Sequence, residues 1–89
     1  MDELEHTLRV GEALRLERGL PIFEARYAII YAGMPGPAVF SVVVMHSIGN
    51  SSLAFNLFSP AGRRSLQVAD GTLDIREVTP EYLSFRYLA

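Results

Sequence analysis

Apolar and polar side chains alternate over short runs along most of the chain. Runs of about 6–11 residues rich in Val, Ile, Leu, Phe and Tyr are separated by clusters of Gly, Pro, Asn and Asp. A period of two is typical of a strand with one buried face, and closely spaced turn signals are typical of antiparallel sheets. We expect strands near residues 7–17, 22–32, 38–47, 52–59, 63–69, 72–78 and 82–88.

Two of these runs carry further information. In the first run Leu8, Val10 and Leu14 share one parity, and Gly11 in its middle predicts a bulge or a sharp bend. The third run, Ala38–Met45, is apolar on both faces, which is typical of a central strand covered on both sides. The last two runs predict a hairpin across the turn at Thr79.

Helical signals are weak. The stretch Leu14–Leu20 contains tolerable helix formers, but we assign it to a strand because its apolar residues repeat every two positions. Only Asp2–Leu8 is compatible with a helical turn, with Asp2 as its cap. Because short strands with apolar residues on both faces must fold over one another, we predict an all-β fold with one domain over residues 1–89. It is a small antiparallel barrel or sandwich of six to seven strands, with room for a short N-terminal helical turn.

Composition narrows the function classes. The 89 residues include no Cys and no Lys, and ten carboxylates oppose eight Arg side chains, which gives a net charge of −2. This balance disfavours a general nucleic-acid binder. No apolar run is long enough to cross a membrane, and the N-terminus is acidic where a secretory signal is basic. We therefore expect a cytoplasmic protein without membrane contact.

Catalytic and metal-binding patterns are not evident. His46 and Ser47 are neighbours on one strand, so their side chains point to opposite faces and His46 is poorly placed to activate Ser47. His6 is the only other histidine, and the two have no metal-ligand spacing. We expect no enzyme, no catalytic residues, no metal site and no cofactor.

Five residues are candidates for contact with a partner. Arg63 and Arg64 open a strand, where paired guanidinium groups could grip an anion and Tyr27 or Tyr31 could add stacking. The alternative for the Arg pair is a solvated turn with surface ion pairs. Met34 lies in the irregular stretch 33–37, either as an adaptable partner contact or in a plain hairpin connection, which loop statistics favour.

The aromatic residues give the strongest indication of function. Phe55 and Phe58 have opposite parities on one strand, so both are buried only if both faces are covered. An apolar face left open would be an association surface. We therefore predict a non-enzymatic interaction module that self-associates, as a homodimer, or docks onto a protein partner through a sheet face or edge. The alternative is a small β-barrel that binds nucleic acid through Arg63, Arg64 and an exposed Tyr.

Overall fold

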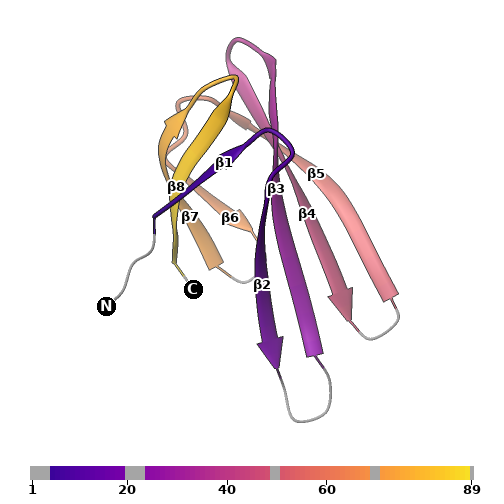
Figure 1. Cartoon of the computed structure of the whole chain (residues 1–89). Helices are drawn as coiled ribbons and strands as arrows, with labels where there is room; N and C mark the ends of the chain where they lie inside the picture. Colours follow the sequence, from indigo (N-terminus) through magenta and orange to yellow (C-terminus); the bar gives the residue numbers. More distant parts are fainter. Residues whose placement is uncertain (1–4, 20–23, 49–50, 69–70, 89) are drawn as a thin grey trace.

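The described part of the chain forms eight strands in two antiparallel sheets (Figure 1). The computed structural model describes residues 5–19, 24–48, 51–68 and 71–88. One sheet has the order β1-β8-β7-β6 and the other the order β2-β3-β4-β5, and no helix occurs among the described residues. The strands are β1 (Glu5–Arg9), β2 (Ala13–Gly19), β3 (Glu24–Gly36), β4 (Val39–Ile48), β5 (Ser51–Pro60), β6 (Ser65–Val68), β7 (Gly71–Val78) and β8 (Tyr82–Leu88).

The predicted first strand is divided into two strands that belong to different sheets. Gly11 adopts a φ of +89°, a conformation that residues with a side chain rarely adopt. Two hydrogen bonds close the turn. The Arg9 amide donates to Glu12 Oε1 (2.7 Å), and the Glu12 amide donates to the Arg9 carbonyl (2.9 Å). The bend was expected. The expected count of six to seven strands is corrected to eight within the described residues, because the chain changes sheets here. Val10 is 52% exposed rather than part of a buried face.

The N-terminal helical turn expected over residues 2–8 is also corrected. Residues 5–8 belong to β1, which pairs with β8, whereas residues 1–4 lie outside the described part of the chain.

One hydrophobic core joins the inner faces of the two sheets. It holds the largest fully buried side chains, among them Tyr31, Phe40 and Phe85. The core residues are Leu8, Ile29, Tyr31, Phe40, Val42, Val44, Val68, Leu73, Ile75, Leu83 and Phe85. Since both sheets contribute, neither could bury its apolar face alone.

The predicted C-terminal hairpin is confirmed, and a bulge explains a break in its pattern. Ile75 is opposite Phe85 and Glu77 is opposite Ser84, so Arg76 is an extra residue on β7. A bulge of this kind shifts the parity of the strand. This is why the inward residues change from odd positions, ending at Ile75, to Val78.

The β3–β4 hairpin is longer than the sequence predicts. The stretch 33–37 was expected to be an irregular loop, but β3 continues to Gly36 and a short turn at residues 37–38 leads into β4. Gly33 sits in a bulge with a φ of +96° and permits this continuation.

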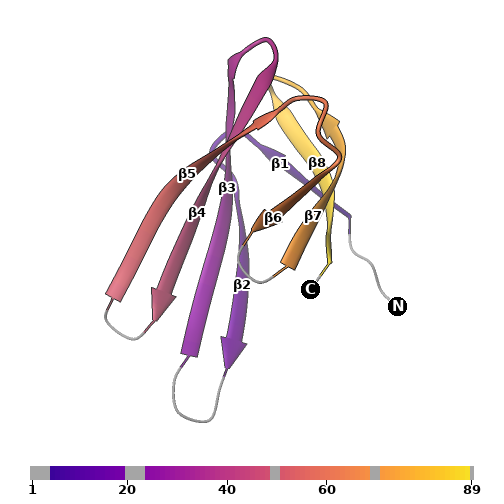
Figure 2. The same cartoon turned by 180° about the vertical axis from the view of Figure 1, so that it is seen from behind.

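One sheet extends beyond the other. In both views the lower ends of β2, β3, β4 and β5 project past β6 and β7 (Figures 1 and 2). The expectation that the third run is covered on both sides holds only in part. Phe40, Val42 and Val44 are buried, but Met45 on the opposite face is 38% exposed.

Candidate functional site: an exposed apolar edge strand

Strand β5 is one of the two edge strands of its sheet and is largely exposed. Among the described strands it pairs with β4 alone. Its ten residues carry no charged side chain, and Leu53, Phe55 and Phe58 are 66%, 50% and 64% exposed. Large apolar side chains on an open strand edge are unusual, because such an edge is a template for pairing with another strand.

The pairing register shows which face each of these side chains occupies. Phe55 is opposite Val44 and Leu57 is opposite Val42, and directly opposed residues share a face. Because Val42 and Val44 point into the core, Leu53, Phe55 and Leu57 lie on the same inner face. Phe58 lies on the outer face of the sheet. Leu53 and Phe55 are 66% and 50% exposed, so the second sheet leaves this part of the inner face largely uncovered.

Beside Phe55 the inner face forms a groove of about 380 Å³ at the open end between the two sheets. Tyr27 and His46 stack in its wall, with ring centroids 4.5 Å apart and planes inclined by 16°. His46 Nε2 is buried and has no hydrogen-bond partner among the residues that the structure describes. The groove is lined by Tyr27, Val44, His46, Phe55, Leu57, Gln67 and Val68. We call Tyr27, His46, Leu53 and Phe55 the uncovered inner face.

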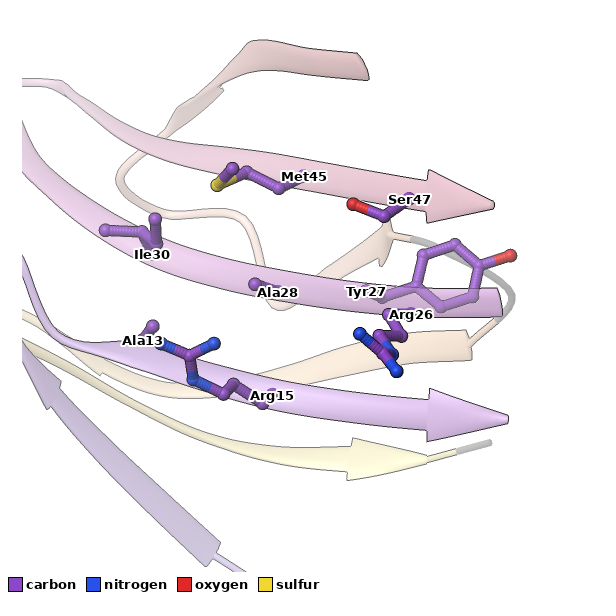
Figure 3. A pocket seen from close by; sticks show the side chains of 8 residues that line it. All are labelled: Ala13, Arg15, Arg26, Tyr27, Ala28, Ile30, Met45 and Ser47. Carbon is purple, nitrogen blue, oxygen red and sulfur yellow. The ribbon is translucent and has the colours of Figure 1, made fainter. Parts of the chain in front are cut away.

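A second hollow lies on the opposite, outer face of the same sheet (Figure 3). It measures about 300 Å³ and has small and apolar side chains in its middle, namely Ala28, Ile30 and Met45. Arg15 and Arg26 also line it. This hollow therefore has an apolar middle, with the guanidinium groups of Arg15 on β2 and Arg26 on β3 at its border.

Arg63 and Arg64 lie at a third place, between the β5–β6 connection and β7. With Arg76 they line a groove of about 300 Å³. The Arg63 Nε donates a hydrogen bond to the Ser65 carbonyl (3.1 Å), whereas the Arg64 side chain forms no hydrogen bond or ion pair with the described residues. Arg76 approaches Asp74 at 3.5 Å. The positive charge of the groove is thus partly balanced by neighbouring carboxylates.

The other predicted contact residues are dispersed. Tyr31 is fully buried and donates a hydrogen bond to the Thr79 carbonyl (2.6 Å), so its predicted contact with a partner does not fit its position. Met34 is half-buried and packs against the core. Tyr27 lies in the uncovered inner face, away from the Arg63 groove. The five residues do not form one surface.

Sequence reasoning missed Leu53 and His46 as site residues. The alternation of Leu53, Phe55 and Leu57 was visible, but it indicates only a shared face. Which part of that face stays open depends on the length and position of the other sheet.

Two tyrosines near the turn between β7 and β8, Tyr31 and Tyr82, have raised pKa values. Burial, with a smaller contribution from the charge of Glu81, raises the pKa of Tyr31. A hydrogen bond to Glu77, followed by burial and by the charges of Glu77 and Glu81, raises the pKa of Tyr82. Both phenols are therefore neutral at physiological pH and serve as hydrogen-bond donors.

Two further properties concern only the described residues. Nowhere among them do three His, Asp or Glu side chains gather as metal ligands do. They also include no helix with the length and hydropathy to cross a membrane.

Comparison of the chain with protein-family models, with curated proteins and with solved structures gives no match.

Proposed function

We propose that the chain is a two-sheet sandwich that serves as a non-enzymatic interaction module and docks through β5. The docking surface consists of the open edge of β5 and the uncovered inner face beside it. The occupant is a second copy or another protein. The observation that carries the proposal is an uncharged ten-residue edge strand with Leu53, Phe55 and Phe58 at least half exposed.

Two physical terms favour occupation of this surface. Exposed apolar side chains gain roughly 25 cal/mol for each Å² removed from water. The free edge also presents backbone groups that an added strand can satisfy at once, which is how β-augmentation gives affinity. Both terms act at the same strand, so one partner strand can use them together.

A small nucleic-acid-binding module is the second candidate. Its support is the groove lined by Arg63, Arg64 and Arg76. It ranks second because the net charge is −2 and because Tyr31, a proposed stacking residue, is buried. Retention on single-stranded DNA that weakens steeply with salt and is lost in the double variant Arg63→Ala/Arg64→Ala would favour this candidate.

The docking function is tested by the size of the native species in an extract of the source cells. We expect the chain to elute well above its own mass of 9.9 kDa and to return to that mass in the variant Phe55→Glu. The matched control is Val10→Glu, which adds the same charge at another half-exposed apolar position outside β5 and should leave the larger species intact. Elution of the wild-type chain at its own mass would refute the proposal.

A further inference from the structure

The inward-facing residues of β5 have the same order in both directions along the strand. They are Ser51, Leu53, Phe55, Leu57 and Ser59. The register with β4 places all five on the inner face, with Phe55 at their centre. Such a series is complementary to itself when two copies run antiparallel, because every residue then meets a residue of its own type.

The backbone of β5 is arranged to accept this pairing. The Ala61 amide donates to the Ala38 carbonyl (2.9 Å), which continues the β4–β5 ladder. Bonded pairs alternate along an antiparallel ladder, so the odd-numbered residues of β5 are bonded to β4. The amide and carbonyl groups of the even-numbered residues point outward. Pro60, which has no amide hydrogen, falls at one of the outward positions, where nothing in the ladder is lost.

We propose that the occupant of β5 is a second copy of this chain, paired antiparallel about a two-fold axis at Phe55. The proposal rests on the docking function proposed above. Only a two-fold axis perpendicular to the sheet keeps both inner faces on one side and the strands antiparallel. The two sheets then join into one continuous sheet with the order β2-β3-β4-β5-β5-β4-β3-β2.

This arrangement fixes the contacts between the two copies. Phe55 lies opposite Phe55 of the second copy, and Leu53 lies opposite Leu57 of the second copy. The outward backbone groups of Ala54 bond to those of Asn56 of the second copy. Phe55 occupies a non-hydrogen-bonded pair, in which the two Cα atoms approach to about 4.5 Å and the side chains are in closest contact.

The assembly should close at two copies. The opposite edge of the same sheet, β2, carries Arg15, Glu17 and Arg18. In the other sheet, β1 carries Glu5 and Arg9, and β6 has only four residues. Charged or very short edges resist pairing. An isologous contact through β5 therefore leaves no second uncharged long edge among the described strands.

The space beside β5 is open to a second copy. Both views place β5 at the outside of the molecule, with β6 set back toward the middle (Figures 1 and 2). Neither sheet therefore stands between β5 and a strand that approaches its edge.

The chain has no cysteine, which allows a crosslinking test specific for the register. Phe55→Cys places one thiol at the axis, and Cα atoms about 4.5 Å apart lie within the range that a disulfide spans. Mild oxidation should convert the purified variant into a covalent dimer. The matched control is Phe58→Cys, because in this register the two copies of residue 58 lie about 20 Å apart along the strands. It should stay uncrosslinked.

Sedimentation equilibrium of the purified chain gives the second readout. We expect the wild-type chain to weigh twice 9.9 kDa and Asn56→Pro to weigh 9.9 kDa. That substitution removes an outward amide but no bond to β4, so the fold should persist, which circular dichroism checks. Met45→Glu, on the outer face, should remain dimeric.

Three results would overturn the second copy as occupant: a wild-type monomer, equal crosslinking of both Cys variants, or dissociation by Met45→Glu but not by Asn56→Pro. A purified monomer together with a larger species in cell extract would refute the second copy alone and would leave docking to another protein. Monomers in both would refute the docking function as well.

Discussion

The two edges of one sheet differ in a way that bears on association. Strands β2 and β5 flank the same β3–β4 pair, and each offers an unpaired row of backbone groups. On β2 the series Ala13–Gly19 includes Arg15, Glu17 and Arg18, whereas β5 has no charge along ten residues. A strand that pairs with β2 must approach the exposed Arg15 guanidinium, and a strand that pairs with β5 meets no charged side chain. Side-chain chemistry therefore selects the edge.

The largest predicted effect is a difference in the stability lost by substitution in the covered and in the uncovered part of the inner faces. Phe85 is fully buried and Phe55 is half exposed. Phe85→Ala should lower the free energy of unfolding by about 3–5 kcal/mol through loss of burial and cavity formation. Phe55→Ala should cost less than about 1 kcal/mol, because a single chain does not cover that side chain.

Urea unfolding measures this difference. Both substitutions should be made in the Asn56→Pro variant, so that dissociation does not enter the measured stability. Equal costs at the two positions would contradict the assignment of Phe55 to an uncovered surface.

The next effect follows from giving β5 the chemistry of β2. In the double variant Leu53→Arg/Phe55→Glu, pairing of the two β5 strands would desolvate the new charges. The two Glu side chains would also meet at the two-fold axis. Such charge contacts cost several kcal/mol, so the dimer dissociation constant should rise at least about 100-fold. Fluorescence-detected sedimentation checks this. The control is Arg63→Ala/Arg64→Ala, which should leave the dissociation constant unchanged. An unchanged dissociation constant in the Leu53/Phe55 variant would contradict the proposal that β5 is the associating edge.

The reciprocal change tests the protection of β2. Arg15→Thr/Glu17→Thr/Arg18→Thr removes the charges from that edge and supplies residues that favour strands. We expect species larger than a dimer, because each chain would then have two edges able to pair and the assembly would no longer close. Light scattering across a concentration series shows the outcome. A variant that stays dimeric would mean that charge does not protect β2.

The smallest effect concerns the Tyr31–Thr79 hydrogen bond behind the β7–β8 turn. Burial raises the pKa of Tyr31, so the folded chain holds the phenol proton more tightly than the unfolded chain does. The resulting stability is complete below the ordinary tyrosine pKa of 10.0 and is lost as pH rises through the higher folded value.

Tyr31→Phe should lower stability at neutral pH by about 1 kcal/mol through loss of this hydrogen bond. It should also flatten the alkaline decline in stability. Urea unfolding from pH 7 to pH 11 measures both. An alkaline decline of the same size in wild type and variant would assign it to other groups. Association through β5 should not change, because Tyr31 belongs to the covered core.

Alternation of side chains was sufficient to predict the all-β class and the β7–β8 hairpin. Both follow from local patterns. A strand has a period of two, and the Thr79-Pro80 turn marks the end of one strand and the start of the next. The bend at Gly11 was equally local. The sequence did not predict that the bend transfers the chain from one sheet to the other, because this depends on the second sheet, in which β2 pairs with β3.

The candidate site shows the same limit. The sequence indicates that Phe55 and Phe58 cannot share a face, and the expectation of an open apolar surface follows from this. It could not indicate that the other sheet leaves Phe55 half exposed, or that Tyr31 is buried and bonded to the Thr79 carbonyl. Both depend on contacts between residues far apart in the chain.

The most direct test of the central claim is amide hydrogen exchange along β5 at two protein concentrations. The account predicts slow exchange at Ser52, Ala54, Asn56 and Phe58 when the chain is concentrated, and fast exchange at the same four amides after dilution. The intervening amides, which are bonded to β4, should exchange slowly at both concentrations. Fast exchange at the four outward amides under both conditions, with protection gained along β2 instead, would contradict the claim that β5 is the edge that associates.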